Sequence, residues 1–140
     1  MNIKARVQIL MRKYRTRDPF ELARACGVIL VYYPLKDVRG FYQYFKRNNI
    51  IYVDETLPKF AQALVLSHEL GHMFLHKTAN AIFMDTRTQF NTRKFEIQAN
   101  KFAMELLLPN EVLLENWQLT IKQLSRLTGY SEALIKLRLQ

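Results

Sequence analysis

Residues 68–72 read H-E-L-G-H, and three of these side chains can bind a metal ion or move a proton. Residues four apart in an α-helix differ by about 40° around the axis and about 6 Å along it, so His68 and His72 would share one face. Two imidazoles at this spacing can close on one zinc ion with bonds of about 2.0–2.1 Å. Glu69 would lie about 100° around from His68. From there its carboxylate can take a proton from a water on the metal.

The surroundings of this motif bear on whether it is a metal site, because the bare pentapeptide also occurs by chance and on solvated surface helices. From Phe60 to Leu75 the sequence is apolar nearly all round the predicted helix, which is typical of a buried helix. Buried polar groups that lack partners cost roughly 1–3 kcal/mol each. A metal ion would supply that partner, so the context favours a metal site.

The elements that must hold this helix can be predicted from the chain on its N-terminal side. Apolar residues at helical spacing predict a first helix over residues 3–14. Asp18 as N-cap and Pro19 at the first helical position predict a second helix that runs to about Ala25. Residues 28–33 are β-branched and aromatic, which indicates a strand.

Two further strands are predicted just before the motif. Residues 40–45 and 50–53 indicate an antiparallel hairpin whose turn lies at residues 47–49. We therefore expect an α+β, zincin-like fold in which a small antiparallel sheet packs on helices. The tyrosines of this hairpin are expected to pack within the sheet, and the alternative is that one of them faces a substrate.

The chain after the motif is expected to contain a loop and a second long helix. The motif helix should end near His76, and the mixed polarity of residues 78–91 predicts an irregular segment near the site. Asn91 or Thr92 can cap the next helix, which Pro109 should stop.

The C-terminal residues predict two short helices in a helix-turn-helix-like arrangement. Thr120 and Ser131 are suitable N-caps, and a glycine separates the two apolar stretches. The second helix carries Lys136 and Arg138 as candidate DNA contacts. Simple packing of this segment against the rest of the protein is the alternative.

Length and composition indicate one globular domain, residues 1–140, with 120–140 as a C-terminal helical subregion. The chain has 140 residues, of which 49% are hydrophobic and 12% aromatic, which excludes a disordered protein. No apolar run approaches about 18 residues, and the N-terminus lacks the apolar stretch of a signal peptide. The single cysteine, Cys26, cannot form an internal disulfide. We therefore expect a cytoplasmic protein with no membrane partner.

The formal net charge of +9 allows several kinds of partner. The basic residues are scattered along the chain, and they form no long basic arm. A generally basic surface, attraction to an acidic protein and attraction to DNA are all compatible with this pattern.

A zinc ion held by two histidines needs a third protein ligand and keeps one position for water. Glu96 and Asn100 are four residues apart on the next predicted helix, so Glu96 can bind the metal while Asn100 hydrogen-bonds a histidine ligand. Gln98 points about 200° away from Glu96 and is not expected to bind the metal. The alternative for Glu96 is a solvated carboxylate among neighbouring basic residues.

These motifs together resemble the ImmA/IrrE group of intracellular metallopeptidases. That group has the pattern H-E-[LI]-G-H, then E-x-E-A-N-x-F-A, then L-L-x-P. Residues 68–72, 96–103 and 107–109 match it in order, and the resemblance covers about residues 18–140. One departure is Gln98, where the group usually has a second glutamate. His76, one turn beyond His72, matches a frequent feature of the group.

The resemblance implies a zinc-dependent regulatory endopeptidase that acts as an anti-repressor. Members of the group on phages and integrative elements cleave the helix-turn-helix repressor of the element. By this resemblance, His68, His72 and Glu96 would bind zinc and Glu69 would be the general base. His76 is interpreted as supporting the ligands or facing the substrate, with helix capping as the alternative. Manganese or iron could replace zinc.

Two rival interpretations come from other classes of protein. One is a non-catalytic, metal-stabilised module that sequesters a repressor, and the other is a DNA-binding regulator that uses the C-terminal helices. We expect a monomer, a repressor as protein partner and no direct binding of DNA. The group that stabilises the oxyanion is left open among His76, Tyr130 and the hairpin tyrosines.

Overall fold

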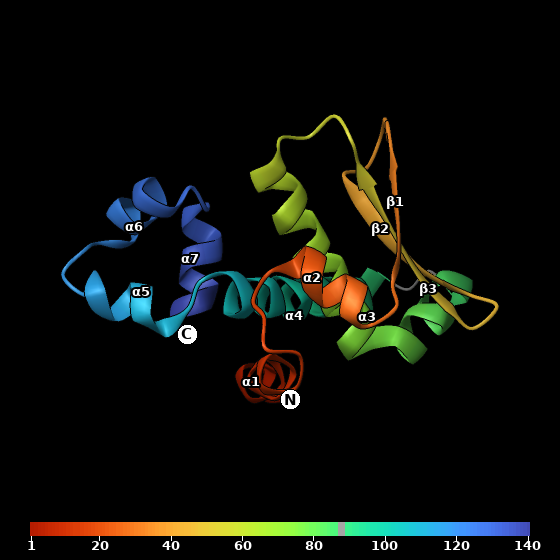
Figure 1. Ribbon diagram of the computed structural model, residues 1–140, viewed down its shortest axis with the longest axis horizontal. Coiled ribbons are helices and arrows are strands. Elements are labelled where there is room, and N and C mark those ends of the chain that lie inside the picture. Colours follow the sequence, from red (N-terminus) through yellow and green to blue (C-terminus); the bar gives the residue numbers. More distant parts are fainter. Residues whose placement is uncertain (87–88) are drawn as a thin grey trace.

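The computed structural model describes the backbone of residues 1–86 and 89–140 and the side chains of residues 1–77 and 92–140. This part of the chain has an α+β fold with seven helices and one three-stranded sheet (Figure 1). The elements follow in the order α1 (Ile3–Tyr14), α2 (Pro19–Ala25), β1 (Ile29–Tyr33), β2 (Gly40–Phe45), β3 (Asn48–Asp54), α3 (Lys59–Thr86), α4 (Gln89–Leu107), α5 (Asn110–Glu115), α6 (Ile121–Thr128) and α7 (Glu132–Leu139). Within the described residues, no helix is long and apolar enough to cross a membrane.

The first two helices begin where the sequence predicts, and each begins with a side-chain cap. The side chain of Asn2 accepts a hydrogen bond from the N–H of Ala5 at the start of α1. Asp18 likewise accepts from the N–H of Phe20 at the start of α2. Each cap satisfies a backbone donor that has no partner within the helix, so these boundaries follow from local sequence.

The sheet is mixed, and the prediction of a purely antiparallel sheet was wrong for β1. Strand β3 lies in the centre, parallel to β1 and antiparallel to β2. The six residues 34–39 between β1 and β2 exceed a tight two-residue hairpin loop, so these strands need not pair directly. Ile51 and Val53 of β3 are fully buried, which favours the central position for that strand.

The hairpin turn lies one residue earlier than predicted. Lys46 and Arg47 form it, with φ angles of 48° and 64°. Two consecutive positive φ angles are the requirement of the two-residue turn that matches strand twist. Asn48 and Asn49 therefore belong to β3 and pair with Phe45 and Tyr44.

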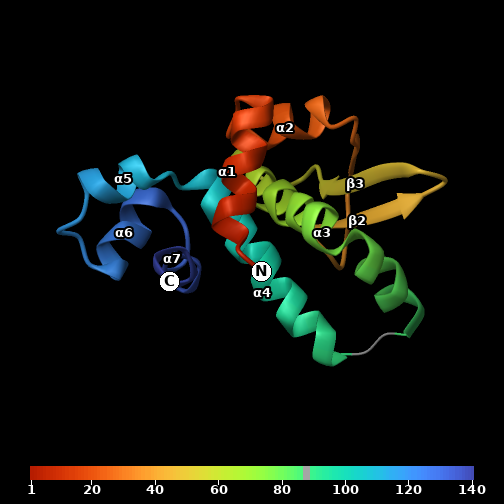
Figure 2. The same cartoon turned by 90° about the horizontal axis from the view of Figure 1, so that it is seen from below.

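Helices α3 and α4 run alongside each other through the middle of the molecule (Figure 2). The prediction of an irregular segment over residues 78–91 was wrong for residues 78–86 and 89–91, which are helical. Helix α3 only kinks at His76 (φ −131°, ψ 18°) and continues to Thr86, while residues 89–91 already belong to α4. Alanine and methionine among residues 78–86 favour this helix. Residues 87–88 lie outside the described part.

Gly71 allows the close approach of α3 and α4. A Cβ atom at this position would lie 3.1 Å from the Cα and carbonyl oxygen of Ala99 and 3.1 Å from the Cβ of Phe102. These are backbone atoms and a Cβ atom, which cannot turn aside as the end of a long side chain can. The glycine inside the H-E-L-G-H motif thus holds the two helices that carry the candidate ligands at short range.

Helix α4 contributes to two hydrophobic clusters. Its Phe102 and Leu106 pack with α1, α2, α3 and the sheet, whereas its Met104, together with Leu108 just after its end, packs with the C-terminal helices. Figure 1 shows α5, α6 and α7 gathered at one end of the molecule and the sheet at the other. Because α4 is buried from two sides, it fixes the C-terminal helices relative to α3.

The C-terminal helices begin at the predicted caps, but Arg138 is not available to DNA. Thr120 and Ser131 cap α6 and α7. The Arg138 side chain is 5% exposed, and its guanidinium donates to the carbonyl oxygen of Leu108 at 2.8 Å and to Oδ1 of Asn110 at 2.6 Å. Its interpretation as a candidate DNA contact was therefore wrong, because this side chain ties α7 to the end of α4.

Candidate functional site

A cleft of about 810 Å³ lies where α3, α4, α7 and the edge strand β2 meet. His68, Glu69 and His72 enter it from α3, and Glu96 enters it from α4. The remaining lining residues are Asp37, Val38, Arg39, Gly40, Phe41, Tyr42, Leu64, Val65, Thr92, Phe95, Asn100, Ser131, Ala133, Leu134 and Leu137. The predicted ligands and Glu69, which come from two separate helices, thus line one cavity.

Donor atoms from three residues, His68, His72 and Glu96, converge in this cleft. The Nε2 atom of His68 lies 2.8 Å from Oε2 of Glu96, and Nε2 of His72 lies 2.9 Å from Oε1 of the same carboxylate. The two Nε2 atoms are 3.1 Å apart. Donor atoms bound at about 2.0–2.1 Å around a tetrahedral ion lie roughly 3.3 Å apart. The two histidine nitrogens and one oxygen of Glu96 therefore need only a small outward shift to hold one divalent ion.

The far side of each imidazole is also held. Nδ1 of His68 lies 2.7 Å from Oδ1 of Asn100, and Nδ1 of His72 lies 3.2 Å from Nδ1 of His76. Nε2 of His76 in turn lies 2.7 Å from Oε1 of Gln98. Because an amide oxygen can only accept, His68 donates through Nδ1, and Nε2 is the nitrogen that faces the metal position. By the same reasoning, Oε1 of Gln98 accepts a hydrogen bond from Nε2 of His76. Nδ1 of His76 then accepts one from Nδ1 of His72.

His76 is buried at the kink of α3. It is 2% exposed, its ring stacks on Phe95 with a centroid distance of 4.3 Å, and it does not line the cleft. Burial lowers the pKa of its imidazole. A buried, neutral ring with partners at both nitrogens supports His72 from behind and offers no surface to a substrate.

Glu69 sits beside the donor atoms and has a separate partner. Its Oε2 lies 3.9 Å from Nε2 of His68, farther than the oxygens of Glu96, and it accepts a hydrogen bond from the backbone N–H of Tyr42. The ligand atoms of His68, Glu69 and His72 nevertheless all lie within 4.8 Å of one another. Burial raises the pKa of Glu69, which makes its carboxylate a stronger base than an exposed glutamate.

The charges of the cluster suit a cation. Hydrogen bonds from His68 and His72 lower the pKa of Glu96, so this carboxylate stays ionised. Burial lowers the pKa of His68, but the hydrogen bond to Glu96 and the neighbouring carboxylates outweigh it and raise the pKa overall. In the absence of metal, a proton on His68 thus partly neutralises two carboxylates. A divalent ion would take over this role at the same nitrogen, so the donor set fits a metal.

The tyrosines considered for the oxyanion have other partners. The hydroxyl of Tyr42 donates to Oδ1 of Asn49 at 2.6 Å, and the ring of Tyr44 lies 4.0 Å from Nζ of Lys77. Tyr130 packs on Phe60 with a centroid distance of 5.0 Å and does not line the cleft.

Two parts of the site could not be found from sequence patterns. One is the backbone of β2 at Tyr42, and the other is the wall formed by Leu134 and Leu137 of α7. A main-chain N–H carries no residue signal, and the two leucines look like ordinary packing residues of a short helix. Gln98 was predicted not to bind the metal, and it instead contacts His76.

An α+β chain that presents H-E-x-x-H from a buried helix at a cleft, with a glutamate opposite, has the organisation of a metallopeptidase. Comparison with known proteins gives the same class, because residues 23–140 match the family model described as the IrrE N-terminal-like domain. The chain belongs to this family, the ImmA/IrrE metallopeptidases. Membership implies a metal cofactor.

The sequence is similar to two curated proteins. An immunity region protein of Bacillus phage phi105 is 40% identical over 139 residues, which are 97% of this chain and 88% of the relative. Metallopeptidase ImmA of Bacillus subtilis strain 168 is 31% identical over 115 residues, which are 81% of this chain and 67% of the relative.

Proposed function

We propose that this chain is a zinc-dependent endopeptidase that cleaves a helix-turn-helix repressor and thereby derepresses a phage or integrative element. The convergence of His68, His72 and Glu96 in one cleft, with Glu69 beside them, is the observation that carries the proposal. The similarity to a phage immunity region protein and to a metallopeptidase supports the biological setting.

Within this proposal, His68, His72 and Glu96 hold the ion. A bound divalent ion would polarise the scissile carbonyl and acidify water. Glu69 accepts the proton of the attacking water and can pass it to the leaving amine. Burial favours this role, because a base whose pKa is raised toward the working pH transfers protons more effectively.

The substrate is proposed to bind as an extended segment along β2. Among the described residues this strand pairs only with β3, so its other edge has no strand partner there, and the N–H of Tyr42 on that edge reaches Glu69. An added strand forms main-chain hydrogen bonds to such an edge. Gly40 helps to bring this edge to the site, because a Cβ there would lie 2.5 Å from a methyl group of Val65 on α3.

Strand-like binding predicts where the repressor is cut. We expect the purified chain with zinc to cleave the repressor encoded beside its gene within a linker or a locally unfolded segment, because a folded helix cannot add to a strand edge. Mass spectrometry of the products gives the position. A cut in the middle of a protected helix of the DNA-binding domain would contradict binding along β2.

The His72–His76–Gln98 path predicts an effect on metal affinity. Gln98→Leu removes the acceptor for His76 and should weaken zinc binding by about 10–100-fold, the range for groups that orient a metal ligand. Gln98→Glu keeps an acceptor oxygen and should bind zinc at least as well as the wild type. Competition with a chromophoric chelator measures both. Equal affinity of Gln98→Leu and the wild type would show that the path does not support the ligand.

A further inference from the structure

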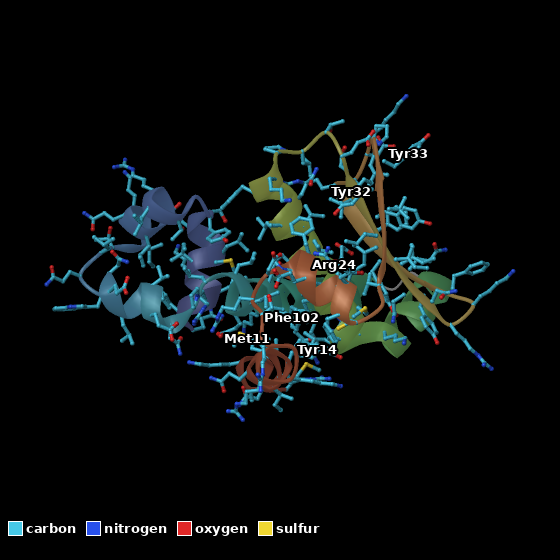
Figure 3. The ribbon with its side chains drawn as sticks, in the orientation of Figure 1. Met11, Tyr14, Arg24, Tyr32, Tyr33 and Phe102 are labelled. Atoms are coloured by element: carbon cyan, nitrogen blue, oxygen red, sulfur yellow. The ribbon has the colours of Figure 1, made fainter. Side chains whose placement is uncertain are left out.

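The sheet has an outer face, turned away from α3, that is unusually apolar. The buried side chains of Tyr42, Ile51 and Val53 point toward the helices. Side chains alternate along a strand, so their neighbours point outward, and Figure 3 shows Tyr32 and Tyr33 on opposite sides of β1. The apolar residues of the outer face are Ile29, Val31, Tyr33, Phe41, Phe45, Ile50 and Tyr52.

This face remains accessible in the described structure. Ile29, Tyr33, Phe41 and Phe45 are 45%, 62%, 40% and 52% exposed, respectively, and the other three are half-buried. A sheet with one solvated face normally carries polar residues there. Contiguous exposed apolar side chains are typical of an interaction site.

Contacts within the outer face already hold some of its side chains in place. The rings of Phe41 and Tyr52 stack across the strands with a centroid distance of 4.2 Å. The hydroxyl of Tyr52 donates to Oε1 of Gln43 at 3.3 Å. Side chains that are already fixed lose little conformational entropy when a partner binds, so this surface suits docking.

Phe41 connects the outer face to the cleft. It belongs to the outer face through its stacking on Tyr52, and it also lines the cleft beside Glu69. Both surfaces meet at the free edge of β2, where the substrate segment is proposed to lie. When a substrate segment is bound along this edge, the folded domain next to that segment can therefore contact the outer face.

The charges around the outer face argue for an acidic partner and against a second copy. Lys46 and Arg47 form the hairpin turn, and Nζ of Lys46 lies 5.3 Å from the centroid of the Phe45 ring. Arg39 is exposed just before β2. The whole chain carries a formal charge of +9, so two copies would bring like charges together. Carboxylates at the rim of the partner would instead be attracted.

We infer that the outer face is a docking surface for a folded domain of the same protein that is cut in the cleft. That domain presents an apolar patch flanked by carboxylates. The inference rests on the proposed function, and it assigns substrate selection to a surface separate from the catalytic groups.

The test compares two double variants in the full chain. Tyr33→Ser with Ile29→Ser removes two exposed apolar side chains from the part of the outer face that β1 forms, away from the substrate strand β2. Leu114→Ser with Trp117→Ser is the matched control, because these side chains are 71% and 75% exposed and lie in and just after α5. Each double substitution is combined with Glu69→Gln for titration against the intact neighbouring repressor at low and high salt. It is also made alone for cleavage of a short peptide spanning the cut.

The outer-face variant is expected to bind the repressor at least about tenfold more weakly, since buried aromatic anchors dominate such interfaces. The control variant should bind as its parent, Glu69→Gln alone, does. Without Glu69→Gln, both double variants should cleave the short peptide at the wild-type rate. Unchanged repressor affinity in the outer-face variant overturns the inference, as does a parent that does not bind the repressor. A shift from dimer to monomer caused only by the outer-face substitutions would assign the face to a second copy instead. If the parent binds the repressor but the wild type cuts nothing, the peptidase proposal fails while the titration still decides the docking surface.

Discussion

Glu69→Gln is expected to bind zinc and the repressor as the wild type does and to lose about 10²–10⁴ in cleavage rate, the usual contribution of a general base. Glu69 lies 3.9 Å from the nearest histidine nitrogen, beside the donor set formed with Glu96. The amide oxygen of glutamine can still accept the N–H of Tyr42. Only the group that takes the proton is removed. Single-turnover cleavage, elemental analysis and a binding titration measure the three quantities separately.

A matched control and a cellular assay complete this test. Glu115→Gln changes the same charge at an exposed position of α5 and should leave cleavage intact. In cells, Glu69→Gln should leave the repressor whole and its operator silent. If this variant relieves repression as well as the wild type does, the protein acts by sequestering the repressor, and the peptidase proposal is wrong.

Glu96→Ala is expected to lose zinc more severely than any variant of the supporting groups. It removes the carboxylate that lies within 2.8 and 2.9 Å of both histidine nitrogens. The loss should exceed the about 10–100-fold effect typical of residues that only orient a ligand. Since a ligand at 100 times its dissociation constant stabilises a fold by about 2.7 kcal/mol, zinc should no longer raise the unfolding temperature. Calorimetry with zinc and with a chelator measures this difference.

The chelated protein provides the internal control for that experiment. The side chain of Glu96 is 49% exposed, so its ion pairs with the histidines are partly solvated and should contribute little to stability. Without metal, Glu96→Ala and the wild type are therefore expected to unfold at similar temperatures, and Glu115→Ala should resemble the wild type in both states. Full zinc occupancy in Glu96→Ala would place the third ligand elsewhere.

The two largest expected effects thus fall on different steps. Loss of Glu96 should abolish the metal, whereas loss of the Glu69 carboxylate should abolish chemistry with the metal still present. A purely structural metal would give the first result without the second.

Local sequence determined the elements whose physics is local. Caps at Asp18, Thr120 and Ser131 satisfy backbone donors within one turn, so the helices begin where the sequence predicts. Helical periodicity placed His68 and His72 on one face of α3 because four residues span about one turn. The pairing of Glu96 with Asn100 on the next helix follows from the same periodicity.

Only the tertiary structure decided the relations between elements. The short distance from Glu96 to the histidines depends on the contact of α3 and α4 at Gly71, because helix packing is set by surfaces distant in sequence. The central position of β3 and the wall from α7 likewise depend on which apolar surfaces are buried together. Gln98 was excluded as a ligand by its angle on α4, yet it contacts the third imidazole of the cluster, that of His76 at the kink of α3. A residue pattern describes one helix at a time, and the site is built from contacts between several.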